Sequence, residues 1–226
     1  MAPRSFPDRV AALAALDDPV RKAVFDLVAA SGEPVGRDAA AEALGVSRRI
    51  AALHLDRLAE QGLLEFEFRR PPGRGGPGAG RPAKLYRRAD DEVAVSVPER
   101  HYDVVGDLLA TAVSDSIATG AEVREVLSRT AYDAGHAIGA AAGDLGSALA
   151  TAGYEPGGDD AGAVYLRNCP FHRLARRHTE LVCGVNLELL RGVADGAGET
   201  GMRAVLDPRP GRCCVRLLPE NVGGSQ

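Results

Sequence analysis

The chain has 226 residues, 45% of them hydrophobic and 26% charged, which is the composition of an ordinary globular protein with one or two domains. No stretch approaches the roughly 18 uninterrupted apolar residues that a membrane span needs. The first residues, MAPRSFPD, lack the apolar region of a secretory signal. We therefore expect a cytoplasmic protein with no membrane partner, in which structural disulfides between the four cysteines are not expected.

The net charge of −4 conceals a strongly basic segment. Residues 47–88 hold ten Lys or Arg against four Asp or Glu, a local charge of +6, whereas residues 1–46 carry −2 and those after 88 carry −8. A basic segment within an acidic chain is typical of a phosphate-binding surface. The alternative is a solvated basic face without a partner.

The first predicted elements form a helix-turn-helix. From Asp8 to Val28 apolar residues recur at helical spacing, and Asp17-Asp18-Pro19 predicts a break between two helices, with Pro19 in the first turn of the second. A short helix is predicted over 36–44, a tight turn at Gly45-Val46-Ser47, and a longer helix over 48–61. The second helix of such a motif places its N-terminal residues in the major groove of DNA.

The helix over 48–61 is expected to bury four apolar side chains, those of Ile50, Leu53, Leu55 and Leu58. An arginine at its start can contact guanine O6 and N7, whereas a serine there more readily donates to a phosphate. His54 could equally read a base edge or lie in the packing seam. The expected DNA-contacting residues of this segment are Ser47, Arg48, Arg49, Ala52, His54 and Arg57.

A hairpin with a basic tip is predicted next. Residues 63–68 alternate as a strand does, 69–82 are rich in Gly, Pro and Arg, and 84–87 predict a returning strand. Helix-turn-helix followed by such a hairpin predicts a winged helix, whose tip lies along phosphates or enters the minor groove. A disordered linker is the alternative. The expected DNA-contacting residues of the hairpin are Arg69, Arg70, Arg74, Arg81 and Lys84.

Two apolar stripes, over 99–119 and 123–143, predict two long helices after the hairpin. We expect at least one of them in a homodimer interface, because a regulator that reads two half-sites needs two copies of its recognition helix. The alternative is that both stripes face only their own domain.

The last third predicts a mixed region of helices and strands. Helices are expected over 145–152, 173–178 and 179–190, a turn at 157–160, a loop at 192–201, and strands over 163–167, 202–206 and 212–218. The fold class is therefore α+β, in three regions. These are a winged helix-turn-helix DNA-binding domain (1–90), a helical dimerisation linker (91–143) and an α+β cysteine-bearing sensor domain (144–226).

All four cysteines lie in the sensor domain: Cys169 at a strand end, Cys183 on a helix, and Cys213-Cys214 at a strand start. Thiolates favour zinc or an iron–sulfur cluster over hard cations. Adjacent strand residues point to opposite faces, so only one of Cys213 and Cys214 is expected to bind a metal unless a bulge intervenes. Inert buried thiols are the alternative. The candidate ligands are Cys169, Cys183, Cys213 or Cys214, and His172, with His178 as second choice for the fourth position.

The stretch LGVSRRIAALHLDRLAEQGLLEF resembles the core of winged-helix repressors of the ArsR kind. GRPAKLYR, NCPFHRLARRHTELVCGVNLELLRG and PGRCCVRL are similar to the SufR-like branch of these regulators, found in actinobacteria and cyanobacteria. The resemblance implies a dimeric repressor of cluster-assembly genes that holds an iron–sulfur cluster through Cys169, Cys183 and one of Cys213 or Cys214. The fourth ligand and the doubled cysteine depart from that pattern, which leaves zinc open.

We therefore expect a homodimeric transcriptional repressor, not an enzyme, that binds an inverted-repeat operator in double-stranded DNA. Binding, loss or oxidation of the iron–sulfur cluster would control its operator affinity. One alternative is a regulator with a structural zinc site and a small-molecule effector. A cysteine-dependent enzyme, with Cys169 or Cys183 beside His172 or His178, is more remote because the sequence offers no acid–base set to complete a reaction.

Overall fold

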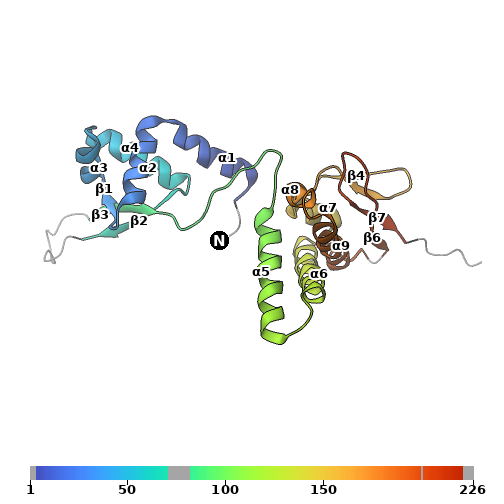
Figure 1. Ribbon diagram of the computed structural model, residues 1–226. Helices are drawn as coiled ribbons and strands as arrows, with labels where there is room; N and C mark the ends of the chain where they lie inside the picture. Colours follow the sequence, from blue (N-terminus) through green and yellow to red (C-terminus); the bar gives the residue numbers. More distant parts are fainter. Residues whose placement is uncertain (1–3, 71–81, 200, 221–226) are drawn as a thin grey trace, which may run out of the picture. The chain divides into compact units, whose positions relative to one another are not determined.

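The computed structural model describes residues 4–70, 82–199 and 201–220. The chain is a mixed α+β protein that divides into two compact units, Met1–Val95 (unit 1) and Ser96–Gln226 (unit 2). Each unit combines helices with a small antiparallel sheet (Figure 1). The α+β class expected from the sequence is confirmed. The helices expected as a linker over 91–143 belong to unit 2, where they pack against its other helices.

Apart from a short 3-10 helix at 15–17 and a two-residue strand at 35–36, which the sequence did not predict, unit 1 follows the order of elements expected from its sequence. Its elements are α1 (Phe6–Ala14), the short 3-10 helix η1 (Ala15–Asp17), α2 (Pro19–Ala30), β1 (Val35–Gly36), α3 (Arg37–Leu44), α4 (Arg48–Glu60), β2 (Leu64–Arg69) and β3 (Ala83–Arg88). The sheet has the order β1-β3-β2, and β2 pairs with β3 in antiparallel register from Leu64 opposite Arg88 to Arg69 opposite Ala83.

Local chemistry explains where these helices begin. The Asp18 carboxylate accepts a hydrogen bond from the Arg21 amide at 2.8 Å, and Pro19 follows it at the first helical position of α2. The predicted break at this point is confirmed. The core of unit 1 lies between α2, α4 and the sheet, with the fully buried side chains of Leu55, Leu58 and Tyr86 at its centre.

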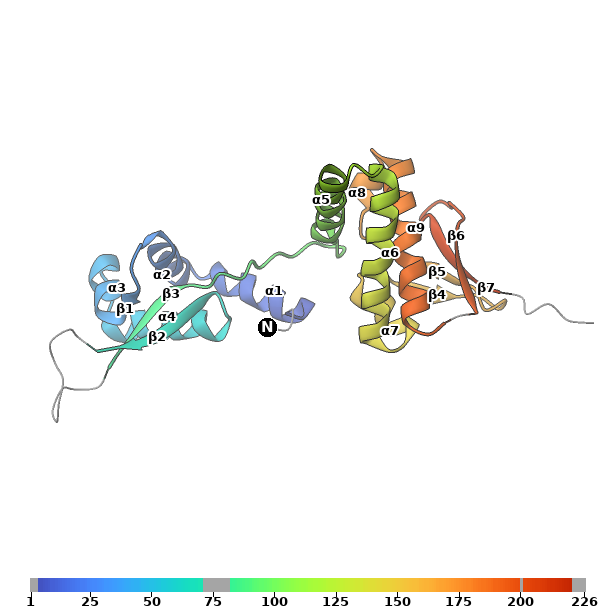
Figure 2. The same cartoon turned by 90° about the horizontal axis from the view of Figure 1, so that it is seen from below.

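Unit 2 contains α5 (Tyr102–Thr119), α6 (Val123–Ala142), α7 (Leu145–Thr151), β4 (Pro156–Gly158), β5 (Val164–Leu166), α8 (His172–Ala175), α9 (Thr179–Gly196), β6 (Met202–Leu206) and β7 (Val215–Pro219). Its antiparallel sheet has the order β4-β5-β7-β6. Helices α6 and α9 lie side by side, with α5 against α6 on one side and the sheet against α9 on the other (Figure 2). No helix among the described residues is both long and apolar enough to cross a membrane.

Several boundaries in unit 2 differ from the sequence prediction, and three of them bear on the sheet or on the cysteines. The turn predicted at 157–160 begins as strand β4, because Gly157 pairs with Tyr165 of β5. The loop predicted over 192–201 is wrong in its first half, since α9 continues to Gly196. The strand predicted from residue 212 begins only at Val215, so Cys213 and Cys214 lie in the segment before it. The alternation of a strand therefore does not force these two side chains apart.

Candidate functional site

The turn between α3 and α4 gives α4 a defined start. Gly45 ends α3 in the left-handed region, with φ 65°, a conformation that costs glycine little. The Ser47 hydroxyl accepts a hydrogen bond from the amide of Ile50 at 3.2 Å and so caps α4. Ser47 is exposed, so its hydroxyl caps the helix at an end that solvent can reach.

The exposed face of α4 differs from the prediction. Ala51, Leu55 and Leu58 are the buried residues of this helix, whereas the side chains of Ile50 and Leu53 are 41% and 64% exposed. The prediction that the latter two are buried is wrong. Helix α4 carries two apolar stripes, and α2, α3 and β2 pack against the stripe that contains Leu55 and Leu58.

The three arginines of α4 differ in their surroundings. The Nε atom of Arg48 lies 2.6 Å from the Asp38 carboxylate of α3, and Nη1 of Arg57 lies 3.1 Å from Glu60. Arg49 is exposed and forms no ion pair among the residues that the structure describes. Exposed ion pairs are worth little, so Arg48 and Arg57 can exchange these carboxylates for another anion, and Arg49 has no ion pair to give up in the described part of the chain.

Ala52 and His54 do not lie on the outer face of α4. Both side chains are only partly exposed. The Nδ1 atom of His54 is buried and has no hydrogen-bond partner in the described part of the chain. Of the two positions that the sequence leaves open for His54, the structure places it in the packing seam.

The hairpin residues expected to contact DNA fall into three groups. Lys84 is engaged within unit 1, because its ammonium group pairs with Asp56 of α4 and lies 4.0 Å from the centre of the Phe66 ring. Arg69 pairs with Glu67 at 2.6 Å, and Arg70 is exposed. Arg74 and Arg81 lie outside the described residues.

The four cysteines meet in unit 2, although they come from three separate segments. Cys169 follows β5, Cys183 lies on α9, and Cys213 and Cys214 precede β7. The thiols interact in a row: Cys169 with Cys213, Cys213 with Cys214, and Cys214 with Cys183. The expectation that one of Cys213 and Cys214 points away from the others does not hold. We call these four residues the cysteine cluster.

Hydrogen bonds set the charge of the cysteine cluster. Hydrogen bonds from the thiols of Cys169 and Cys214 lower the pKa of Cys213 below its usual value, against the opposing effect of burial. Hydrogen bonding to Cys213, together with burial, raises the pKa values of Cys169 and Cys214. Within the row, these hydrogen bonds favour the thiolate at Cys213 over Cys169 and Cys214, and thiolate is the form in which cysteine binds metals.

A buried amide also lowers the pKa of Cys213, and the sequence did not predict its role. The Nδ2 atom of Asn186 on α9 donates a hydrogen bond to Sγ of Cys213 at 3.0 Å. Its Oδ1 atom accepts a hydrogen bond from the hydroxyl of Tyr154. Asn186 is fully buried, and its position in the apolar stripe of α9, three residues after Cys183, is the signal that could have revealed it.

Four cysteine thiols are suitable ligands for zinc or an iron–sulfur cluster. Their side chains would have to change rotamer to surround a metal ion or cluster. Among the described residues, no three Cys, His, Asp or Glu side chains are arranged to hold a metal ion. The thiols form a row and do not yet surround a single point. His172 and His178, the candidates for a fourth ligand, are exposed. The thiols interact with one another, with Asn186 and with backbone amides, and not with either histidine. The structure thus brings together the four cysteines and not the histidines.

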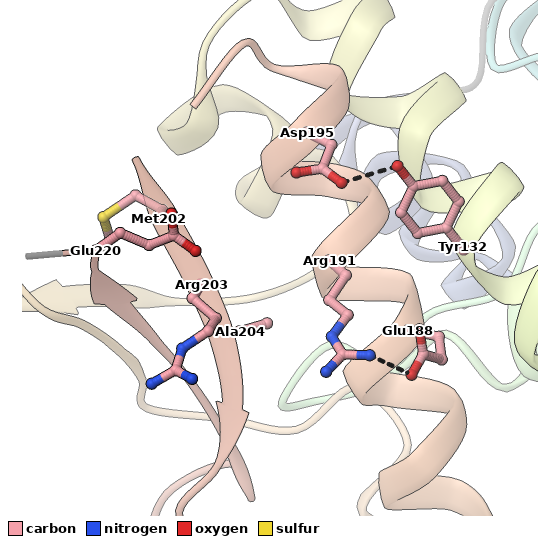
Figure 3. Close-up of a pocket in the computed structure, with 8 residues that line it drawn as sticks. All are labelled: Tyr132, Glu188, Arg191, Asp195, Met202, Arg203, Ala204 and Glu220. Atoms are coloured by element: carbon pink, nitrogen blue, oxygen red, sulfur yellow. Dashed lines mark hydrogen bonds and ion pairs between the residues drawn. The ribbon is translucent and has the colours of Figure 1, made fainter. Parts of the chain in front are cut away.

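A separate pocket of about 290 Å³ lies on unit 2 between α9 and β6 (Figure 3). Within it, Arg191 pairs with Glu188 at 2.9 Å, and the Tyr132 hydroxyl donates to Asp195 at 2.8 Å. Arg203 and Glu220 also line it, and none of the four cysteines contributes to it. The pocket is therefore not part of the cysteine cluster, and its residues supply no ligand to it.

No family model matches this chain, and neither the curated proteins nor the solved structures compared with it include a match. Function is therefore inferred from the residues and their geometry.

Proposed function

We propose that the chain is a homodimeric DNA-binding transcriptional repressor with a winged helix-turn-helix over residues 1–90. Helices α3 and α4 are the helix-turn-helix, α4 is the recognition helix, and β2 and β3 are the strands of the wing. The observation that carries the proposal is the outer face of α4, where Arg49 is exposed and without an ion pair among the described residues. It stands at the start of a capped helix in a segment of charge +6.

A cofactor held by the cysteine cluster would control the affinity for DNA. Cys169, Cys183, Cys213 and Cys214 would bind an iron–sulfur cluster, with zinc as the second candidate. When bound, an iron–sulfur cluster would supply a redox-sensitive centre. Asn186 would hold the sulfur of Cys213 in place, and the buried position of three of the cysteines would limit the access of water. A tenfold change in DNA affinity needs a coupling of only about 1.4 kcal/mol.

The dimer is expected to form through unit 2. Val113 and Ile117 of α5 are exposed by 47% and 80%, outside the face formed by its buried residues Val105, Leu108 and Ala112. Sedimentation of the full-length protein with and without Ile117→Glu tests this. A dimer that becomes monomeric supports the interface, and an unchanged dimer contradicts it.

DNA binding is tested with a random pool of double-stranded 30-mers, from which full-length protein selects its sites. Arg49→Ala is expected to weaken binding to a selected site by about 5- to 150-fold, the range for one arginine–guanine contact. The matched control is Arg203→Ala, an exposed arginine on β6 in unit 2, which is expected to leave binding unchanged. A protein that selects no sequence contradicts the proposed function.

The cofactor is tested by purifying the protein without oxygen and measuring iron, sulfide and zinc. Iron and sulfide that are lost in Cys213→Ser support an iron–sulfur cluster, and stoichiometric zinc that resists oxidation supports the second candidate. A colourless, metal-free protein that binds DNA equally before and after reconstitution contradicts the role of the cofactor.

A further inference from the structure

Two large apolar side chains lie on the outer face of α4 without a role in the core. Ile50 and Leu53 are three residues apart, so they are neighbours on one face of the helix, and they are 41% and 64% exposed. The core of unit 1 is already closed by Ala51, Leu55 and Leu58, each with no exposed surface. Single exposed apolar residues are common, but two neighbouring ones beside exposed arginines at the start of this helix indicate a contact surface for a partner.

The charges around the pair indicate what that partner is. Leu53 lies four residues after Arg49 and four before Arg57, so an arginine stands one turn away on each side of it. A second copy of this face would bring arginine against arginine, whereas a duplex offers phosphates and base edges to the arginines. Among the bases of DNA, thymine presents a methyl group in the major groove, and apolar side chains contact it.

We propose that Ile50 and Leu53 contact the C5 methyl groups of thymines, so that the protein selects half-sites with thymines beside the base that Arg49 contacts. This inference rests on the proposed function and adds the sequence class of the operator. Arg49 would supply hydrogen bonds to one base, while the two apolar side chains would discriminate at neighbouring positions where no hydrogen bond is made. Removal of one contacted methyl group is expected to weaken binding about fourfold.

The test replaces thymine with deoxyuridine, which lacks only the C5 methyl group. Full-length protein first selects its sites from the random pool of 30-mers. Each thymine of a selected site is then replaced singly, and affinity is measured by fluorescence anisotropy for the unmodified protein, Leu53→Ala and Ile50→Ala. The expected result is a loss of about fourfold at one or two thymines in each half-site, which disappears at one position in Leu53→Ala and at another in Ile50→Ala.

Leu206→Ala is the matched control, because Leu206 is 52% exposed on β6 in unit 2; this variant should keep every deoxyuridine effect. Selected sites at which deoxyuridine is neutral throughout, or effects that persist in both apolar variants, overturn the inference and leave DNA binding intact. Selection of no sequence overturns the proposed function as well. A change of Leu53→Ala from dimer to monomer in sedimentation would assign this face to a protein partner, and would also overturn the inference.

Discussion

Asn186 joins the cysteine cluster to the core of unit 2 through single hydrogen bonds. Its amide nitrogen donates to Cys213 and its amide oxygen accepts from Tyr154. Tyr154, which lies between α7 and β4, therefore fixes the orientation of the amide on α9. Both side chains are buried, and burial leaves no water to replace a lost partner. The stability of unit 2 and the position of the central sulfur therefore depend on the same pair of residues.

Tyr154→Phe is expected to lower the free energy of unfolding by about 1–3 kcal/mol, because it leaves the Oδ1 atom of Asn186 buried without a donor. Denaturant titration of the reduced protein measures this. Tyr165→Phe is the matched control, since the Tyr165 hydroxyl has no hydrogen-bond partner in the described part of the chain, and a change within about 0.5 kcal/mol is expected. Equal effects of the two substitutions would contradict the role of Asn186.

In unit 1, Asp56 predicts a dependence of stability on pH. Burial tends to raise its pKa, but hydrogen bonds from Lys84 and Tyr86 outweigh burial and lower the pKa below 3.8. A carboxylate whose pKa is lower in the folded state stabilises the fold above its unfolded pKa, and this stabilisation is lost as the pH falls through the folded pKa. Asp56→Asn is therefore expected to show a smaller loss of stability between about pH 5 and pH 2. Chemical denaturation across this range tests it, with the exposed Asp26→Asn as control.

Among the elements, α6 and α9 approach so closely that glycines must lie between them. A Cβ atom on Gly135 of α6 would lie 2.0 Å from the carbonyl oxygen of Leu189, and one on Gly192 of α9 would lie 2.0 Å from that of Tyr132. These distances involve backbone atoms, which cannot turn away as a side chain can. Because Cys183 and Asn186 lie on α9, the same contact positions the cysteine cluster.

Gly135→Ala is expected to force α6 and α9 apart and to lower the free energy of unfolding by about 1–3 kcal/mol or more. Gly184→Ala on α9 is the matched control, since a Cβ atom there meets nothing within 4 Å. That control should be neutral or stabilise the protein by up to about 1 kcal/mol, because alanine is the better helix former. A destabilisation of the same size in both variants would contradict the close-packing argument.

For the whole molecule, the division into two compact units predicts that a DNA duplex affects unit 1 and unit 2 differently. A selected duplex at about 100 times its Kd should stabilise unit 1 by about 2.7 kcal/mol, because it binds only the folded form. Hydrogen exchange should become slower in α4 and change little in α9, beyond the modest coupling that the proposed control by a cofactor requires. Equal protection of α4 and α9 would contradict the independence of the units.

Much of unit 1 could be predicted because its signals are local. Asp18 and Pro19 start a helix by themselves, Gly45 adopts a conformation that other residues avoid, and the alternation in residues 63–68 is typical of a strand beside a helix. Each of these depends on neighbours within a few residues. For the same reason the order of elements, the α+β class and the basic segment could be taken from the sequence alone.

The tertiary structure decided which face of α4 is buried and how the cysteines meet. Either stripe of α4 satisfies the helical period, and only packing of α2 and β2 selects Leu55 and leaves Leu53 exposed. The cysteines are separated by 13 and 29 residues, so their meeting depends on the contact of α9 with the sheet. The sequence by itself determined the local elements and the charge, whereas the burial of faces and the approach of distant side chains required the packing of whole elements.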